Sequence, residues 1–234
     1  MTAQIPDKVY FNGSEYVLIG HKGENLPTPQ DYGLNPIMWS TACYRGYVST
    51  YSVREGGLYL ASLHIGRLAL DATWHPINGV EPETVYQEGY SKDPANPGQT
   101  ITRHYEYGRI YNNLDLPTYF TGGILVGRVF IRELYVHMGF GKPYQYEEVV
   151  EFLFHEGTLT ETIDHSGRAA KWREQVIAER EEQQRRIEEL KAKGYTGKDL
   201  TDRLYGNSAP PGEDDMRRGI EWRFSLDYSD WFRE

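Results

Sequence analysis

The segment at 46–66, GYVSTYSVREGGLYLASLHIG, constrains the fold more than any other, because it has the pattern of two β-strands joined by a tight turn. Apolar and polar residues alternate on both sides of Glu55-Gly56-Gly57, as they do along strands whose successive side chains face opposite ways. Both faces are partly apolar, which favours a central position in a sheet. We therefore expect the chain to be organised around an antiparallel hairpin.

A second segment, at 148–167, resembles this hairpin when the sequence is compared with itself at a constant offset. The matched positions are Tyr51 with Phe152, Val53 with Phe154, Glu55 with Glu156, Gly56 with Gly157, Leu58 with Leu159, His64 with His165 and Gly66 with Gly167. Every hairpin needs a turn glycine and an apolar face, so such a likeness also arises by chance. Duplication of a β half and chance similarity both remain open.

Other segments point to the same fold class. Residues 8–20 form two apolar runs around Asn12-Gly13, a dipeptide suited to a two-residue hairpin turn. We predict an α+β chain that is predominantly antiparallel β. The expected architecture is a hairpin-rich sheet or a partly open barrel, with two similar β halves as one option, plus one long C-terminal α-helix and a returning C-terminal strand.

The predicted organisation begins with a β-rich domain at 1–166, with halves at 1–75 and 103–166. Between them, 76–102 is rich in proline and glycine and has little periodicity, which indicates a long excursion loop or a boundary between halves. A binding or gating role and an inert insertion are both open for this loop.

A helical segment is predicted at 167–206, because 168–193 contains neither proline nor glycine and is rich in strong helix formers. Its middle is almost wholly charged or amide, so it either projects as an arm, pairs with a second copy or lies on the sheet by its ends. Residues 207–234 are read as a linker and a strand that packs on the β domain, because Ile220, Trp222, Phe224 and Leu226 alternate.

Composition narrows the function classes. The net charge is −9, with 34 acidic and 25 basic residues, which disfavours sequence-independent binding to nucleic acid. The single cysteine, Cys43, allows no intramolecular disulfide, and no apolar run approaches the roughly 20 residues that span a membrane. The start of the chain lacks the pattern of a signal peptide, so a soluble, cytoplasmic protein without membrane contact is expected.

No cofactor or metal is predicted. Phosphate-binding glycine motifs are absent, and the histidines show no HExxH spacing. Cys43 could act as a nucleophile if a histidine such as His137 approached it, but a structural cysteine is the simpler reading.

Polar and aromatic residues are densest in three stretches, at 39–45, 103–105 and 132–137. If these stretches were neighbours, they would form a small-molecule pocket of the usual make-up. The candidate ligand-binding residues are Trp39, Tyr44, Arg45, Arg103, His104, Glu133 and His137. The alternative is that the charged residues form surface ion pairs and Trp39 belongs to the core.

Two functions follow from these patterns. The first is a non-enzymatic protein-binding module that uses an aromatic β surface and a charged helical arm, with a protein partner or self-association through 168–194. Its acidic charge would favour a basic partner. The second is an enzyme or small-ligand-binding β protein with a pocket near Arg45, Glu133 and His137. The sequence does not decide whether the protein is an enzyme.

Overall fold

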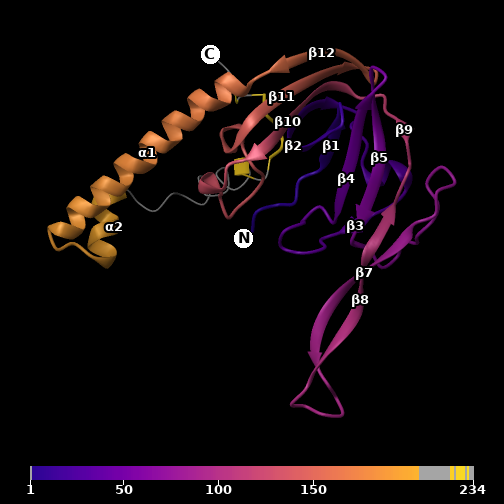
Figure 1. Ribbon diagram of the computed structural model, residues 1–234, viewed down its shortest axis with the longest axis horizontal. Helices are drawn as coiled ribbons and strands as arrows, with labels where there is room; N and C mark the ends of the chain where they lie inside the picture. Colours follow the sequence, from indigo (N-terminus) through magenta and orange to yellow (C-terminus); the bar gives the residue numbers. More distant parts are fainter. Residues whose placement is uncertain (1, 206–221, 224, 230, 232–234) are drawn as a thin grey trace.

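The predicted hairpins are joined edge to edge in the computed structural model, which describes residues 2–205, 222–223, 225–229 and 231 (Figure 1). Within these residues, seven strands form a ring in the order β12-β11-β10-β2-β1-β4-β5, and β5 returns to β12. Neighbours in the ring are antiparallel except β1 and β4, which are parallel. The ring strands are β1 (Lys8–Phe11), β2 (Ser14–Glu24), β4 (Tyr47–Arg54), β5 (Gly57–Ile65), β10 (Thr121–Phe130), β11 (Tyr146–His155) and β12 (Thr158–Asp164). The predominantly antiparallel β fold is confirmed.

The two hairpins that resemble each other in sequence meet where the ring closes. Each turns at a Glu-Gly pair with positive φ at both residues, 51° and 73° in the first hairpin and 48° and 79° in the second, as a type I′ turn requires. The Leu58 amide donates to the Gly157 carbonyl at 2.9 Å, and the Leu159 amide donates to the Gly56 carbonyl at 2.7 Å. The contact is therefore reciprocal. Whether the likeness reflects duplication stays a prediction.

Next to this contact, the edge of β5 is taken by other parts of the chain. The short strand β9 (Leu116–Pro117) pairs with β5 at Tyr59 and Leu60, and the end of β8 (Thr100–Tyr111) pairs with β5 further along. Strand β5 thus has three successive partners along one edge.

The interior of the ring is filled by side chains. The alternation of β4 and β5 sends one side chain in two inward, as the sequence predicts. Buried tyrosines find polar partners: the Tyr51 hydroxyl donates to the Pro27 carbonyl and the Tyr111 hydroxyl to the His75 carbonyl, at 3.0 and 2.8 Å. This packed core fills the interior with apolar side chains. The core includes Val9, Leu18, Tyr51, Leu60, Ile65, Tyr111, Phe120, Ile124 and Phe152.

A long two-stranded hairpin projects from the barrel where a loop was predicted (Figure 1). Its strands are β7 (Glu83–Lys92) and β8 (Thr100–Tyr111), and only the end of β8, at 109–111, pairs with the ring, through β5. The prediction of a loop at 76–102 is therefore wrong at 83–92 and at 100–102, which form strands. The physical reason is that both faces of this ribbon lie in water, so neither strand needs the alternating pattern that a buried face imposes.

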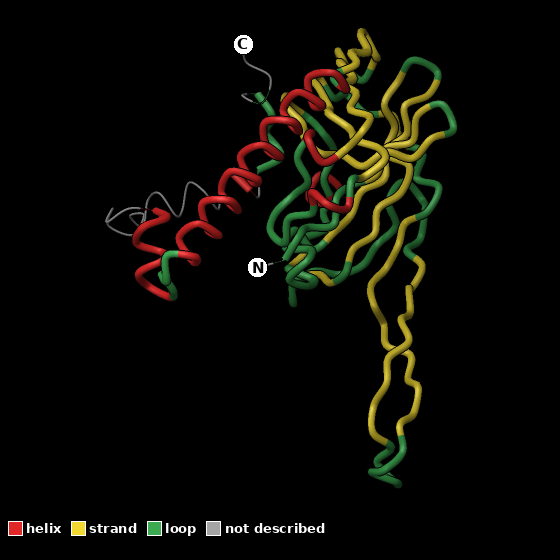
Figure 2. The backbone as a smooth tube through the Cα atoms, turned by 60° about the vertical axis from the view of Figure 1, so that its left-hand side comes forward, coloured by secondary structure: helices red, strands yellow, loops and turns green. Residues whose placement is uncertain are grey.

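The helical segment is confirmed as α1 (Ser166–Ala192) followed by α2 (Gly197–Tyr205). The first turns of α1 lie on β11: Ala169 is fully buried, Trp172 packs edge-on against Tyr144, and Arg173 donates to the Tyr144 carbonyl at 2.9 Å. Beyond these turns α1 leaves the barrel and carries α2 at its far end, in a different direction from the β7–β8 hairpin (Figure 2).

The remaining elements are short. They are the strands β3 (Pro36–Ile37) and β6 (Arg67–Leu68), which pair with each other, and the 3-10 helices η1 (Pro29–Tyr32), η2 (Arg132–Leu134) and η3 (Pro143–Gln145).

The C-terminal tail returns to the barrel as predicted, but its described residues do not form a strand. Residues 222–223 lie in a helical turn and 225–228 are irregular, while Ile220 and Phe224 lie outside the described residues. Tyr228 is buried, and the Leu226 carbonyl accepts a hydrogen bond from the His21 amide at 2.7 Å. The tail carbonyls of Trp222 and Ser225 accept hydrogen bonds from the Lys142 side chain.

Candidate functional site

Arg45 is the predicted site residue whose surroundings are best defined. Its guanidinium binds the Asp7 carboxylate through two hydrogen bonds, of 2.8 and 3.0 Å, and lies over the rings of Tyr47 and Phe140. Asp7 is buried and also accepts from the Ser49 amide at 2.7 Å. Burial alone would lower the pKa of Arg45, but the Asp7 carboxylate outweighs it and raises that pKa above its ordinary value. The charge of Arg45 is therefore balanced within the fold.

Trp39 and Tyr44 lie in the same loop as Arg45 but have different contacts. The Trp39 ring packs against His64 and Tyr107, with centroids 4.6 and 4.5 Å away, and covers Gly66, where a Cβ atom would come within 2.1 Å of the indole. Burial lowers the pKa of His64, which favours the neutral imidazole. Trp39 thus belongs to an aromatic cluster with His64 of β5 and Tyr107 of β8, where the β7–β8 hairpin joins the barrel. Tyr44 is exposed.

The other four predicted residues lie elsewhere. Arg103 and His104 are exposed on the projecting hairpin, where His104 Nε2 is 3.4 Å from a Glu88 carboxylate oxygen. Glu133 belongs to η2 and is exposed, and His137 is exposed beside the Tyr135 ring. None of the described contacts joins Arg45, Glu133 and His137.

Sequence reasoning missed a cluster of polar side chains around Glu151 on β11. One Glu151 carboxylate oxygen is 2.5 Å from the Tyr228 hydroxyl and 2.9 Å from Lys22 Nζ, and the other is 2.8 Å from His165 Nε2. Glu151, His165 and Tyr228 are buried, and Lys22 is partly exposed. A signal existed, because the nearest neighbours of Glu151 on its strand face, Val149 and Leu153, are both apolar.

Hydrogen bonds within the cluster determine the charge of Glu151. Burial by itself would raise the pKa of Glu151, but hydrogen bonds from Tyr228, His165 and Lys22 outweigh it, so that pKa is lowered and the carboxylate is charged. Burial and the Glu151 carboxylate raise the pKa of Tyr228, which stays protonated. The cluster therefore joins the tail, the start of α1 and strand β2 to β11.

Lys142 is the second buried polar feature. Its ammonium group donates to the carbonyls of Trp222 and Ser225 at 3.1 and 3.3 Å, and it lies over the rings of Trp222 and Trp231. Burial, with a smaller contribution from the charge of Arg223, lowers the pKa of Lys142 to about 8. Lys142 therefore holds the tail with a cation that is costly to bury.

Replacing Lys142 with methionine is expected to change how stability depends on pH. The pKa of Lys142 is about 8 in the folded protein and 10.5 as a free side chain, so the unfolded chain binds more protons between these values. The free energy of unfolding of the parent protein should therefore rise as pH increases from 8 to 10.5, by up to about 1.4 kcal/mol per pH unit. Urea denaturation at pH 7–10.5 measures this. The rise should be absent in Lys142→Met and present in Lys171→Met, which changes an exposed lysine of α1; an equal rise in Lys142→Met would contradict the assignment.

Cys43 does not show the surroundings of a nucleophile. It is buried, its thiol lies 3.4 Å from the Tyr47 carbonyl, and burial raises its pKa, which disfavours the thiolate. In the described part of the chain, no group of three or more His, Cys, Asp or Glu side chains is placed to hold a metal ion.

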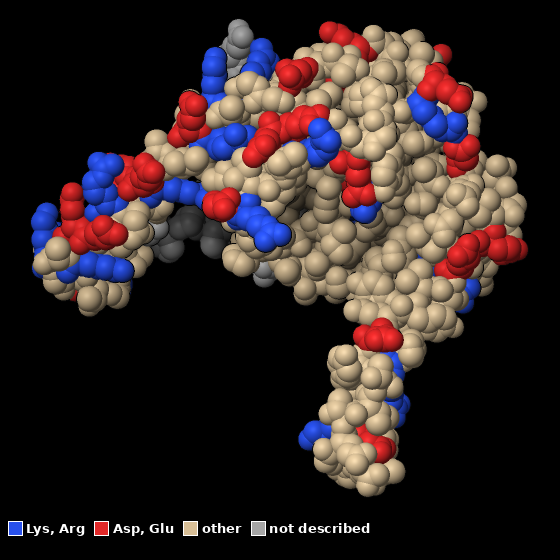
Figure 3. Space-filling model, in the orientation of Figure 1, with Lys and Arg blue, Asp and Glu red and all other residues tan. Residues whose placement is uncertain are grey.

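The largest outward-facing features are the two projections. On the β7–β8 hairpin, Tyr86 and Tyr90 are 63% and 76% exposed on one face, and Tyr105 is 48% exposed on the other. On α1, acidic and basic side chains are interspersed along the free length (Figure 3). No described helix has the length and apolar character needed to cross a bilayer.

In comparisons with known proteins, no family model matches the chain, and neither a curated protein nor a solved structure does. The fold defines a closed seven-stranded barrel that carries a β-hairpin and a helical hairpin as separate projections.

Proposed function

We propose that this protein is a non-enzymatic binding module that recognises another protein through the β7–β8 hairpin and the charged helix α1. The observation that carries the proposal is the free hairpin. An isolated two-stranded ribbon is at best marginally stable in water, and a third strand or a covering surface stabilises it. A partner that covers the ribbon would supply that surface.

The side chains on the hairpin support this role. Tyrosine presents a large rigid ring and a hydroxyl, and it is enriched at protein interfaces. Exposed tyrosines on both faces of one ribbon fit a partner that grips it from either side or surrounds it. The net charge of −9 favours a basic partner and would speed the encounter with it.

A small-molecule site near Arg45, Glu133 and His137 is the less supported alternative. A ligand anion there would compete with Asp7, which already binds the guanidinium of Arg45 through two hydrogen bonds. The protein-binding proposal needs no such displacement.

Shortening the hairpin tests the proposal. Gln87 and Tyr105 are cross-strand partners, so an Asn-Gly turn can join them in place of residues 88–104. We expect the shortened protein to keep the circular dichroism spectrum of the barrel and to lose the partners that the full chain co-purifies from its own cells. Affinity of each recovered partner would then be measured by calorimetry with the full chain, the shortened chain and the double variant Tyr86→Ala/Tyr90→Ala.

Tyr105→Ala serves as the matched control, because it removes one exposed tyrosine from the opposite face. A loss of affinity in either tyrosine variant would assign the binding face. Recovery of the same partners with unchanged affinity by the shortened chain would contradict the proposal.

A further inference from the structure

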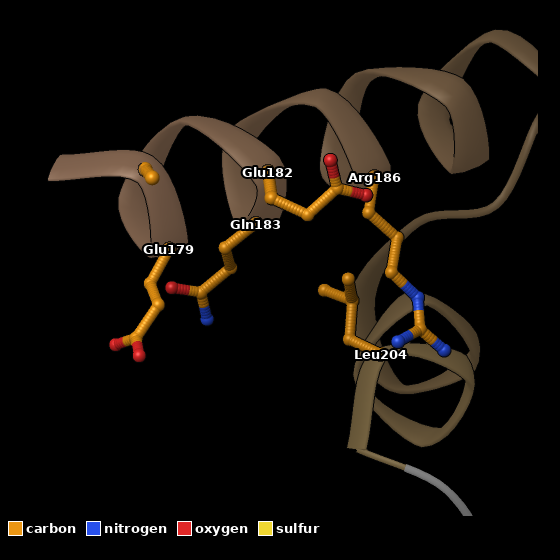
Figure 4. Close-up of a pocket in the computed structure, with 6 residues that line it drawn as sticks. Glu179, Glu182, Gln183, Arg186 and Leu204 are labelled. Carbon is orange, nitrogen blue, oxygen red and sulfur yellow. The ribbon is translucent and has the colours of Figure 1, made fainter. Parts of the chain in front are cut away.

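A groove lies between α1 and α2 at the end of the helical projection (Figure 4). It has a volume of about 530 Å³, and most of its surface is apolar, formed by short side chains and the aliphatic parts of longer ones. Leu204 of α2 points toward α1, and Arg186 of α1 reaches past it toward α2, where it donates to the Arg203 carbonyl at 3.1 Å. The lining residues are Ala178, Glu179, Glu182, Gln183, Arg186 and Leu204.

The two helices leave much of their apolar surface unburied. Ile187 and Leu190 on α1, and Leu200 and Leu204 on α2, are only half-buried. Most of the stability of a helix in a protein comes from packing of its apolar face, and two helices joined by a turn bury little of it. Packing against two further helices, as in a four-helix bundle, is the usual solution.

The charges around the groove are complementary to those of the same surface on a second copy of the chain. An antiparallel pair of α1 helices centred between Glu182 and Gln183 places Glu179 opposite Arg186 of the second copy, and Arg186 opposite its Glu179. Among the described residues, neither Glu179 nor Arg186 has an ion-pair partner within the chain.

The mixture of positive and negative charges on α1 favours a second copy of this chain over a strongly basic or strongly acidic partner. Acidic and basic side chains alternate along the free part of α1, so a partner of one sign would meet repulsion as often as attraction (Figure 3). A two-fold arrangement pairs Glu179 of each copy with Arg186 of the other, because an isologous dimer uses the same surface on both subunits.

We propose that the α1–α2 groove binds the same groove of a second copy of this chain, with the two α1 helices antiparallel and Glu179 paired with Arg186 in both directions. This inference rests on the proposed function, because it identifies the partner of the charged helix, and it leaves the β7–β8 hairpin for a different protein.

Charge reversal in the full-length protein tests the register. Sedimentation velocity over a range of concentrations should show a dimer for the parent chain. Glu179→Arg and Arg186→Glu should each raise the dimer dissociation constant about tenfold or more, because each variant places like charges opposite one another twice. Glu181→Arg is the matched control: it makes the same change of charge on α1 outside the groove lining, and it should leave the dissociation constant unchanged within about twofold.

Mixing the two variants gives the decisive result. In a heterodimer of Glu179→Arg with Arg186→Glu, every contact again joins opposite charges, so the equimolar mixture should dimerise with nearly the parent dissociation constant. Circular dichroism would confirm that each variant keeps its helix content. A parent chain that is monomeric at all concentrations, an unchanged dissociation constant in the single variants, or a mixture that fails to recover would each overturn the proposal.

The shortened-hairpin protein separates this inference from the proposed function. It should dimerise like the parent while losing the protein partner. A dimer that persists when no partner depends on the hairpin would contradict the proposed function alone.

Discussion

Replacement of Asp7 by alanine is expected to lower the free energy of unfolding by about 3–5 kcal/mol, since removing one partner of a buried ion pair leaves the other charge uncompensated. Asp7 is 3% exposed, and its carboxylate binds both the Arg45 guanidinium and the Ser49 amide. Urea denaturation at pH 7 measures the loss. The effect should be large because Arg45 cannot lose its charge at any ordinary pH.

Two further variants make this expectation specific. Asp71→Ala changes an exposed loop aspartate and should alter stability by less than about 0.5 kcal/mol. Combining Asp7→Ala with Arg45→Met removes the unpaired charge and should recover part of the loss. If Asp7→Ala cost less than about 1 kcal/mol, the ion pair would contribute no more than a surface pair does.

Replacement of Glu151 by glutamine is expected to lower the free energy of unfolding by about 3 kcal/mol at pH 7, because the neutral amide leaves Lys22 and His165 without a carboxylate partner. The loss should also depend on pH. The pKa of Glu151 is lowered in the folded protein from an ordinary value of 4.5, so the carboxylate stabilises the fold above that value. This stabilisation disappears as the pH falls through the lowered pKa.

The difference in unfolding free energy between the parent and Glu151→Gln should therefore have its full size at pH 7. It should become smaller as the pH falls from about 4.5 to 3. Glu147→Gln, on an exposed position of the same strand, is the matched control and should show little difference at either pH. A loss in Glu151→Gln that stays constant down to pH 3 would show that shape, and not charge, determines the role of this side chain.

The features predictable from the sequence are those encoded by neighbouring residues. The Glu-Gly turns, the alternation along 47–54 and the uninterrupted run of helix formers at 168–193 each specify their own backbone, so the hairpins and α1 lie where expected. Tyr51 and Phe152, which occupy matching positions in the two similar hairpins, are both buried.

The features that could not be predicted depend on residues far apart or on the absence of a core. Asp7 meets Arg45, and Glu151 meets Tyr228, only because the barrel brings distant segments together. Strand β7 carries no buried face, so its sequence resembles a loop. The tail keeps a strand-like pattern, but Lys142 binds its carbonyls at Trp222 and Ser225, and such a contact has no local signature.

The attachment of the β7–β8 hairpin has a mechanical consequence. The hairpin is joined to the barrel through β5, by a ladder of three residue pairs at Leu63, His64 and Ile65. The same strand closes the ring at its other end through the bonds of Leu58 and Leu159. A partner that pulls along the hairpin would therefore transmit force directly to the strand that closes the ring. Under such a force, the three residue pairs between β5 and β8 would be sheared and would separate before the longer strand pairings of the barrel.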